Sequence, residues 1–331
     1  MEKIDYQAEI LCNRISKRFK HLKKWAKRCN ISSFRIYDKD IPEIPLAIDF
    51  YEGYPANEDT HFTEKFLVFY LYERPYEKDE NEEFSWLQIL SCKVAELLEV
   101  SANNIFLKIR KKQKGENQYE KENKNSVLLR VVEQGNLFLV NLSNYLDTGL
   151  FFDHRPLRKI VQEKAKDKSI LNLFCYTASF SVYGAKGGAR KVTSVDLSNT
   201  YLTWAKKNFE LNGLSSTNEK YSFINGDVKL FLEKNTEKYD IIILDPPTFS
   251  NSKKTQNDLD INRDWPKFVE LCLNSLNPDG ILYFSTNSKK LRFDQNLLPQ
   301  NISVKDITEA TIPEDFKNKK IHKCWEIKNI L

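Results

Sequence analysis

The chain has 331 residues, about twice the size of a typical domain, which favours two domains over one large domain. A hydrophobic content of 41% suffices for packed cores, whereas a net charge of +5 is too small to identify a partner. No stretch approaches the ~20 apolar residues of a membrane span, and the first residues lack the apolar core of a signal peptide. We therefore expect a cytoplasmic protein with no membrane partner.

Cysteine and histidine usage argues against a structural metal site. The six cysteines lie far apart without a CxxC pair, and the chain has only four histidines. We predict that no metal is bound and that the cysteines are reduced thiols of the core: Cys12, Cys29, Cys92, Cys175, Cys272 and Cys324.

The first long segment, residues 5–30, carries apolar residues at steps of three and four, which predicts an amphipathic helix. Its other faces hold eight cations and no acid between residues 14 and 28. These charges are compatible with a solvated helix face or with a surface that contacts phosphates. In the second case, the candidate RNA-binding residues are Arg14, Lys17, Lys24 and Arg28.

The rest of residues 1–145 predicts a small α/β domain. Aromatic and branched residues indicate strands at 33–38, 45–53 and 65–73, and a strand pair lies within 127–142. The acidic run 77–83 is expected to be an exposed loop, followed by a helix at 84–100 and a strand at 104–108. The basic stretch 108–125 is either a flexible loop or an RNA-gripping tip, with Lys111, Lys112 and Lys114 as candidate RNA ligands.

In residues 146–331 the pattern changes to strands that alternate with helices. Strands are expected at 169–174, 191–196, 221–226, 239–245 and 280–286, with helices between them that include 201–212 and 265–276. This alternation predicts a doubly wound, Rossmann-like parallel sheet with helices on both faces. Ligands of such sheets bind beyond the carboxyl ends of the strands, so we place the candidate site there.

The turn after the first of these strands lacks the GxGxxG fingerprint of dinucleotide-binding proteins, and no phosphate-binding GxxxxGK[ST] motif is present. Small residues still permit a tight turn, and backbone amides at the start of the following helix suit a carboxylate such as that of methionine. The candidate ligands here are Asn172, Phe174, Tyr176, Thr177 and Ala178.

Carboxylates follow the next three strands. Asp196, with Leu197 and Ser198, comes at roughly the ~20-residue offset at which an acid binds ribose hydroxyls. Asp227 and Val228 follow the third strand, where a carboxylate suits an adenine edge. For both aspartates the alternative role is to cap the next helix.

The fourth strand ends in Asp-Pro-Pro-Thr-Phe, residues 245–249. Pro246 and Pro247 have no N–H group, so the carbonyls and the Asp245 carboxylate remain as acceptors, with Phe249 as a stacking plane. This set suits a planar base that carries an exocyclic amine. A plain turn at a strand end is the alternative.

Four segments carry a family resemblance: LNLFCYTASFSVYGAKGGA, TSVDLSNTYLTWAKKNFELNGL, YDIIILDPPTFSNSKK and DFKNKKIHKCWEI. With matches further forward, they resemble the bacterial 23S rRNA guanine-N7 methyltransferase, usually the C-terminal half of a fused guanine-N2/guanine-N7 enzyme. The resemblance covers nearly the whole chain. It implies S-adenosylmethionine as cofactor, 23S rRNA or a large-subunit assembly intermediate as partner, and an RNA-positioning role for the first domain.

The resemblance also assigns residues. Asp196 would bind the cofactor ribose, Asp227 the adenine, Thr177 and its neighbours the methionine end, and residues 245–249 the target guanine. Asp153, His154 and Arg155 would close over the cofactor, although a domain-interface ion pair is the alternative for Arg155. Two departures stand out: Ala178 replaces a usual glycine, and the fused N2 half is missing, which leaves a separate guanine-N2 methyltransferase as a possible partner.

The chemistry of the target atom narrows the reaction. Enzymes that methylate cytosine C5 need a cysteine nucleophile, and no cysteine follows Asp245 or the fifth strand closely. Guanine N7 carries a lone pair and no proton, so its direct methylation needs alignment and no general base. We expect direct transfer to N7, with guanine-N2 or adenine-N6 methylation, or a non-catalytic RNA-binding assembly factor, as the alternatives.

Overall fold

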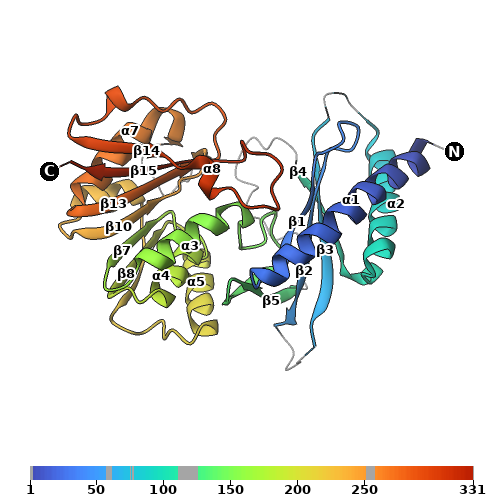
Figure 1. Ribbon diagram of the computed structural model, residues 1–331, viewed down its shortest axis with the longest axis horizontal. Coiled ribbons are helices and arrows are strands. Elements are labelled where there is room, and N and C mark those ends of the chain that lie inside the picture. Colours follow the sequence, from blue (N-terminus) through green and yellow to red (C-terminus); the bar gives the residue numbers. More distant parts are fainter. Residues whose placement is uncertain are drawn as a thin grey trace. The chain divides into compact units, whose positions relative to one another are not determined.

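The computed structural model describes residues 3–56, 62–74, 76, 78–110, 126–250 and 258–330 (Figure 1). The chain forms two compact units. The first comprises Met1–Thr148 and Glu314–Lys317, and the second comprises Gly149–Pro313 and Asn318–Leu331. Within the described residues, no helix combines the length and the apolar character needed to cross a membrane.

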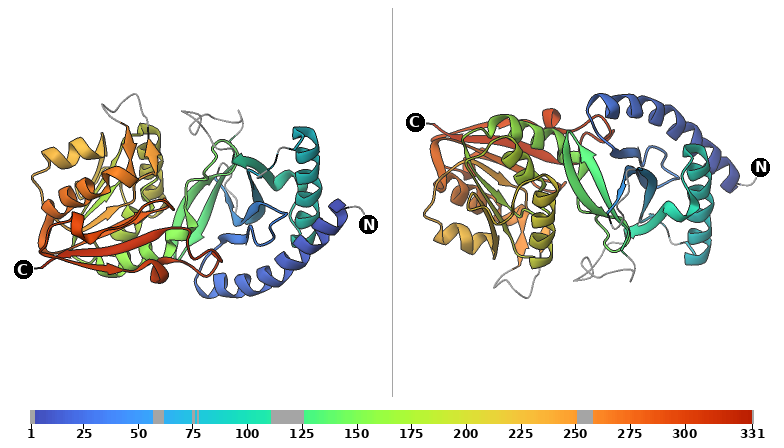
Figure 2. Two further views of the ribbon diagram at one scale, coloured as in Figure 1. Left: turned by 90° about the horizontal axis from the view of Figure 1, so that it is seen from above. Right: turned by 90° about the horizontal axis from the view of Figure 1, so that it is seen from below.

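The first unit is a mixed sheet with two long helices on one face (Figures 1 and 2). Strand order is β4-β3-β2-β5-β6, with β1 beside β2, and β3 and β4 are the parallel pair. Apolar residues of both helices share one core with the sheet. The elements are α1 (Lys3–Arg28), β1 (Ser33–Asp38), β2 (Leu46–Pro55), β3 (Glu64–Tyr72), α2 (Glu80–Leu98), η1 (Ala102–Asn104), β4 (Ile105–Arg110), β5 (Leu128–Glu133) and β6 (Asn136–Asn141).

The acidic run predicted as a loop belongs largely to α2. Asp79 caps this helix, and its Oδ1 accepts hydrogen bonds from the backbone N–H groups of Asn81 and Glu82 at 3.0 Å each. Glu80, Glu82 and Glu83 lie in the first turn, where the helix dipole stabilises negative charge. The loop prediction was wrong because acids at a helix start favour the helix.

A short segment far along the chain completes the first unit. Asp315 is fully buried, and its Oδ2 accepts a hydrogen bond from the backbone N–H of Arg35 at 3.0 Å. The carbonyl of Asp315 accepts from the Arg18 guanidinium at 2.5 Å. Phe316, also buried, lies 4.8 Å below the Arg35 guanidinium. No feature of the sequence predicted this return.

The second unit has a seven-stranded sheet in the order β14-β15-β13-β10-β7-β8-β9. Strands β7, β8, β9, β10 and β13 are parallel, and β15 pairs antiparallel with both β13 and β14. Its strands are β7 (Ser169–Leu173), β8 (Lys191–Asp196), β9 (Tyr221–Asn225), β10 (Tyr239–Leu244), β13 (Leu276–Thr286), β14 (Ile302–Asp306) and β15 (Lys323–Asn329), with a short pair β11 (Phe249–Ser250) and β12 (Leu259–Asp260).

Helices cover both faces of this sheet, as predicted for a doubly wound fold (Figure 1). Residues of α6 and α7 share a core with the sheet, and α3, α4 and α5 pack in sequence on the other face. The helices are η3 (Phe152–His154), α3 (Arg155–Lys164), α4 (Ser179–Lys186), α5 (Asn199–Leu211), α6 (Val228–Lys234), α7 (Ile261–Asn274), η4 (Gln295–Leu297) and α8 (Thr308–Thr311). The topology reverses between β7 and β10, which is where such sheets bind ligands.

The cysteines are free thiols but do not all lie in the core. Cys175, Cys272 and Cys324 are buried, Cys12 and Cys29 are half-buried, and Cys92 is exposed. The prediction of a core position was therefore wrong for Cys92, which lies on the outer face of α2.

Candidate active site at the carboxyl edge of the second sheet

The turn between β7 and α4 has an unusual backbone. Phe174, Tyr176 and Ala178 all adopt left-handed conformations, with φ of 53°, 53° and 59°. For residues with a side chain this region costs roughly 1–2 kcal/mol each, and such strain clusters at functional sites. The Ala178 conformation also explains why a glycine suits this position.

Buried hydrogen bonds hold the turn in place. The Thr177 hydroxyl donates to the Gly149 carbonyl at 2.6 Å, and the Thr177 carbonyl accepts from the Asn208 side chain at 2.9 Å. Asn172 is 1% exposed, and its amide donates to the Ser181 hydroxyl at 2.9 Å. The side chains of Asn172 and Thr177 thus support the turn, while their predicted role as cofactor ligands stays a prediction.

Asp196 joins this turn to the end of β8. Its two carboxylate oxygens accept from the backbone N–H groups of Tyr176 and Ser198, each at 2.8 Å. Burial raises the pKa of Asp196, while these backbone bonds favour its ionised form. The carboxylate is half-buried, and its position is fixed from both sides.

The end of β9 supplies the next acid. Asp227 caps α6 by accepting from the Leu230 N–H at 2.9 Å, and Ser198 caps α5 by accepting from the Tyr201 N–H at 3.3 Å. The Asn225 amide donates to the carbonyls of Asp196 and Leu197, at 3.2 and 2.9 Å. Val228 is the first residue of α6 and its side chain is buried, while its predicted contact with the cofactor stays a prediction.

Asp245 follows β10 and receives a hydrogen bond from a neighbouring strand. The Ser285 hydroxyl of β13 donates to Asp245 Oδ1 at 2.6 Å, and His154 Nε2 lies 3.3 Å from Asp245 Oδ2. The Asp245 side chain keeps 26% of its surface exposed. Pro246 is buried, whereas Pro247 and Phe249 are exposed, so the loop presents a carboxylate and an aromatic ring to solvent.

A cavity of 420 Å³ opens beside this loop. Apart from Thr248 and Phe249, sequence reasoning did not single out the residues of its wall. The lining residues are Thr248, Phe249, Asp260, Asn262, Asn287, Ser288, Lys289 and Lys290. Hydrogen bonds order the wall: Thr248 donates to Asn287 Oδ1 at 2.7 Å, and Ser288 donates to Asn262 Oδ1 at 2.6 Å.

A buried cluster lies on the other side of Asp245. His322 Nδ1 is 3.0 Å from Asp153 Oδ2, and the rings of His154 and His322 stack at 4.5 Å. Burial works against ionisation of Asp153, but His154 and the bond to His322 hold its pKa below the usual range. Arg155 is 1% exposed beside the Phe152 ring, so its side chain offers no open surface. Sequence reasoning singled out Asp153 but missed the pairing with His322, which lies far along the chain.

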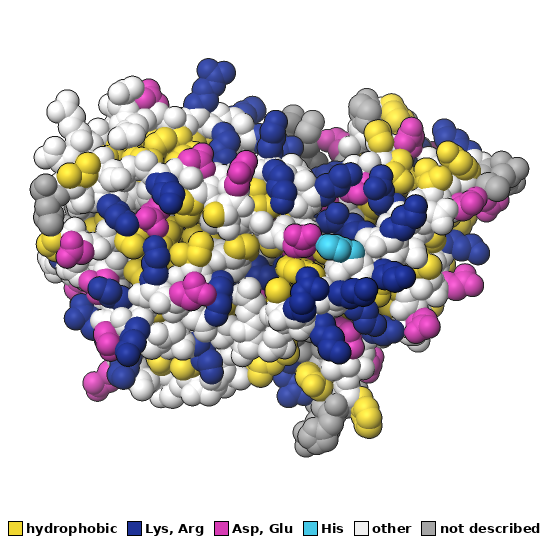
Figure 3. Space-filling view, viewed as in Figure 1, with side chains coloured by type: hydrophobic (Ala, Val, Ile, Leu, Met, Phe, Trp, Pro, Cys, Tyr) yellow, Lys and Arg dark blue, Asp and Glu magenta, His cyan; other side chains and the backbone are white. Residues whose placement is uncertain are grey.

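The first unit carries the predicted basic surface. Lys and Arg side chains gather over α1 in Figure 3, and those of Lys17, Lys24 and Arg28 are exposed. Arg14 lies 3.7 Å from Asp40, so part of its charge is compensated. The predicted contacts Lys111, Lys112 and Lys114 fall outside the described residues.

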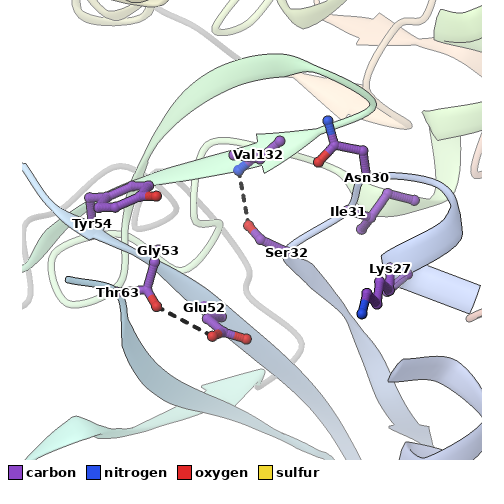
Figure 4. A pocket seen from close by; sticks show the side chains of 10 residues that line it. Lys27, Asn30, Ile31, Ser32, Glu52, Gly53, Tyr54, Thr63 and Val132 are labelled. Atoms are coloured by element: carbon purple, nitrogen blue, oxygen red, sulfur yellow. Dashed lines mark hydrogen bonds between the residues drawn. The ribbon is translucent and has the colours of Figure 1, made fainter. Parts of the chain in front are cut away.

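A second hollow, of 270 Å³, opens in the first unit at the C-terminal end of α1 (Figure 4). Its rim includes Lys27, which belongs to the basic face of the helix, and Tyr54. The Ser32 hydroxyl accepts from the backbone N–H of Val132 at 2.9 Å, a hydrogen bond between two residues that line the hollow. No sequence pattern predicted this hollow.

Comparisons with known proteins agree with this geometry. A family model described as an S-adenosylmethionine-dependent methyltransferase matches residues 100–298. Ribosomal RNA large subunit methyltransferase K of Neisseria meningitidis is 45% identical over 320 residues, covering 96% of this chain and 86% of that protein. Ribosomal RNA large subunit methyltransferase K/L of Hahella chejuensis is 43% identical over 330 residues, but the chain spans only 44% of its length.

Solved structures share the fold. An S-adenosylmethionine-dependent methyltransferase from Streptococcus mutans has a TM-score of 0.69 at 22% identity, covering 97% of this chain and 81% of that one. The methyltransferase SMU.776, solved with S-adenosylhomocysteine, has a TM-score of 0.68 at 23% identity, covering 96% and 81%. From its fold, its strand-end carboxylates and its near full-length similarity to the Neisseria protein, the chain belongs to the family of S-adenosylmethionine-dependent ribosomal RNA large subunit methyltransferases.

Proposed function

We propose that this protein methylates a guanine of 23S rRNA at N7 by direct transfer from S-adenosylmethionine. The observation that carries the proposal is the placement of Asp245, an acceptor carboxylate ordered by Ser285 and exposed at the switch point of the sheet. The similarity to ribosomal RNA large subunit methyltransferases supports the class of substrate.

The carboxyl edge of the sheet fits the cofactor. When bound, S-adenosylmethionine supplies a methyl group on a positively charged sulfur. Asp196, ordered by the N–H groups of Tyr176 and Ser198, has further lone pairs for the ribose hydroxyls. Asp227 lies at the end of the adjacent strand, within the same edge, and we assign it to the adenine. The strained turn at Phe174–Ala178 presents backbone to the methionine end.

The target guanine is assigned to the surface between Asp245 and the 420 Å³ cavity. Asp245 accepts from the N–H donors of the base, and the exposed Phe249 ring gives a stacking plane. Lys289 and Lys290, on the cavity wall, suit the phosphates that flank a flipped nucleotide.

Attack by N7 needs no proton acceptor, because that atom carries no proton at neutral pH. The acids of the site agree with a reaction that needs no base, because Asp196, Asp227 and Asp245 each already accept a hydrogen bond from the protein. We therefore assign these acids to binding and alignment. The protein contributes to the rate by holding nucleophile and methyl group at near-contact distance.

The basic face of α1 is proposed to hold the RNA backbone. Lys17, Lys24 and Arg28 are exposed cations on one helix, and phosphate contacts of this kind give affinity without sequence preference. Replacing all three with alanine should weaken RNA binding and reduce the salt dependence by roughly 0.7–0.9 per lost contact in a plot of log affinity against log salt. Lys186→Ala, an exposed cation of the second unit, is the matched control.

The experiment that tests the reaction uses the full chain, S-adenosylmethionine and rRNA from cells that lack the gene. Products are mapped by nucleoside mass spectrometry for the wild type, Asp245→Ala and the control Asp279→Ala, an exposed aspartate on β13. We expect 7-methylguanosine from the wild type and the control but not from Asp245→Ala. A methylated amino group in its place overturns the N7 assignment, and the absence of methylation together with the absence of cofactor binding overturns the enzyme.

A further inference from the structure

A continuous set of polar side chains leads from Asp245 into the protein. His154 Nε2 lies 3.3 Å from Asp245 Oδ2 and 3.8 Å from Asp153 Oδ2. Asp153 Oδ2 is in turn 3.0 Å from His322 Nδ1, and His322 Nε2 is 2.9 Å from the Thr311 hydroxyl. Both histidines are buried, with exposures of 6% and 1%. Such a buried arrangement is costly unless its members have partners, so each contact constrains the next.

These contacts define which nitrogen of His154 carries a proton. Nε2 lies between two carboxylate oxygens, whereas Nδ1 is buried and has no hydrogen-bond partner among the described residues. Burial lowers the pKa of His154, against the opposite effect of Asp245 and Asp153. A neutral imidazole in this position therefore has its single proton on Nε2, facing the acids.

Asp153, His154 and His322 each place one possible metal-ligand atom within 4.8 Å of the others, but both nitrogens of His322 and Oδ2 of Asp153 already have hydrogen-bond partners. His322 Nδ1 faces Asp153 and His322 Nε2 faces Thr311. The two imidazole rings stack in nearly parallel planes, 13° apart. The arrangement is that of a hydrogen-bonded support.

We propose that His154 is a positioning residue for Asp245, held in its own orientation by the stacked His322 and by Asp153. The Nε2–H of His154 approaches one carboxylate oxygen while the Ser285 hydroxyl donates to the other. Together they fix the plane of the carboxylate and leave its remaining lone pairs for the target base. This inference rests on the proposed role of Asp245 in holding that base.

The inference predicts a difference between two amide substitutions of His154. Glutamine places its side-chain nitrogen near the position of Nε2, whereas the shorter asparagine places it near Nδ1 and does not reach Asp245. We expect kcat for rRNA methylation to fall about 10–100-fold in His154→Asn, the size of effect that loss of one polar contact with a charged carboxylate produces. His154→Gln should retain at least about ten times the kcat of His154→Asn, while S-adenosylmethionine affinity stays similar in both.

A structural role alone gives a different pattern. If His154→Gln and His154→Asn lose activity equally, or if kcat falls only in proportion to cofactor binding or to the fraction of folded protein, the positioning role is overturned. Comparison of the thermal unfolding of the two variants gives the folded fraction.

Nitrogen NMR tests the same inference without methyl transfer. The chain has four histidines, so the imidazole signals are assignable by substitution. The groups that face His154 are Asp153, Asp245, His322 and Arg158. In Asp245→Asn the wild-type Nε2–H pattern of His154 should change and its pKa should fall further, because one of the two facing acids is removed. No change at His154 overturns the inference, whereas a wild type that fails to methylate rRNA overturns the proposed function alone.

Discussion

At Gly149, in the second unit, both the backbone conformation and the neighbouring side chain exclude a larger residue. Its φ of +104° lies in a region that residues with a side chain rarely adopt, and a Cβ built there falls 2.3 Å from Cζ2 of Trp204. In an alanine variant, the strained backbone costs about 1–3 kcal/mol, and displacement of the Trp204 ring costs about a further 1–3 kcal/mol. Alanine recovers about 0.4–1 kcal/mol by restricting the unfolded chain. Gly149→Ala should therefore destabilise the protein by roughly 3 kcal/mol.

Two other glycines allow the cost of the backbone conformation and the cost of the steric clash to be measured separately. Gly213 has a φ of +69° but nothing within 4 Å of a built Cβ, and Gly226 has neither a positive φ nor a neighbour. Gly213→Ala should cost about 0.5–1 kcal/mol, from the backbone term less the unfolded-state gain. Gly226→Ala should be neutral or stabilising by a few tenths of a kcal/mol.

The assay is urea unfolding followed by tryptophan fluorescence, with a double-mutant cycle that combines Gly149→Ala with Trp204→Leu. The cycle should show a favourable interaction of about 1–3 kcal/mol, since removal of the ring removes the clash. If Gly149→Ala costs no more than Gly213→Ala, or if the cycle shows no interaction, the steric argument is refuted. Because the Gly149 carbonyl also accepts from Thr177, cofactor affinity should decrease together with stability.

Three further predictions concern Asp196, His154 and Asp315. Asp196→Ala should weaken S-adenosylmethionine binding about 10–100-fold in calorimetry, since it removes charged hydrogen bonds, and Asp279→Ala should leave it unchanged. Burial lowers the pKa of His154, so the free energy of unfolding should fall as the pH drops below about 6.5. His154→Gln should reduce this dependence of the unfolding free energy on pH, as measured by urea titrations at several pH values. An identical pH dependence in the variant would contradict the burial argument. Asp315→Ala leaves the backbone N–H of Arg35 without its acceptor and should cost about 1–3 kcal/mol, whereas Glu314→Ala, on the exposed neighbour, should cost under about 0.5 kcal/mol.

The sequence was most informative where one local pattern determines the structure. Strands β7, β8 and β10 belong to a regular alternation of short strands and helices, so Asp196 and Asp245, at or directly after strand ends, were assigned to the carboxyl edge of the sheet. The helix α1 was equally clear, because its apolar spacing continues for many turns. In these elements local propensity and the final fold agree.

Features that depend on distant residues were not predictable in this way. His322 lies beyond β14 and α8, directly before β15, and no spacing in the sequence connects it with Asp153. Asn172 stands at a strand end where ligands bind, but its side-chain amide is buried against Ser181, a contact that the sequence does not indicate. Whether a strand-end polar residue faces the solvent or the core depends on packing that the sequence pattern does not contain.

The return of Glu314–Lys317 to the first unit has a consequence for how the protein is made. Translation delivers α1 and β1 first, whereas Asp315, which accepts from the Arg35 N–H, is synthesised 280 residues after Arg35, and Phe316 follows it. The first unit therefore reaches its complete native packing only after β7 to β14 of the second unit have been synthesised, although domains usually fold in order from the N-terminus. A fragment that ends at Thr148 lacks this closing segment, so dissecting the protein at the apparent boundary yields an incomplete first unit.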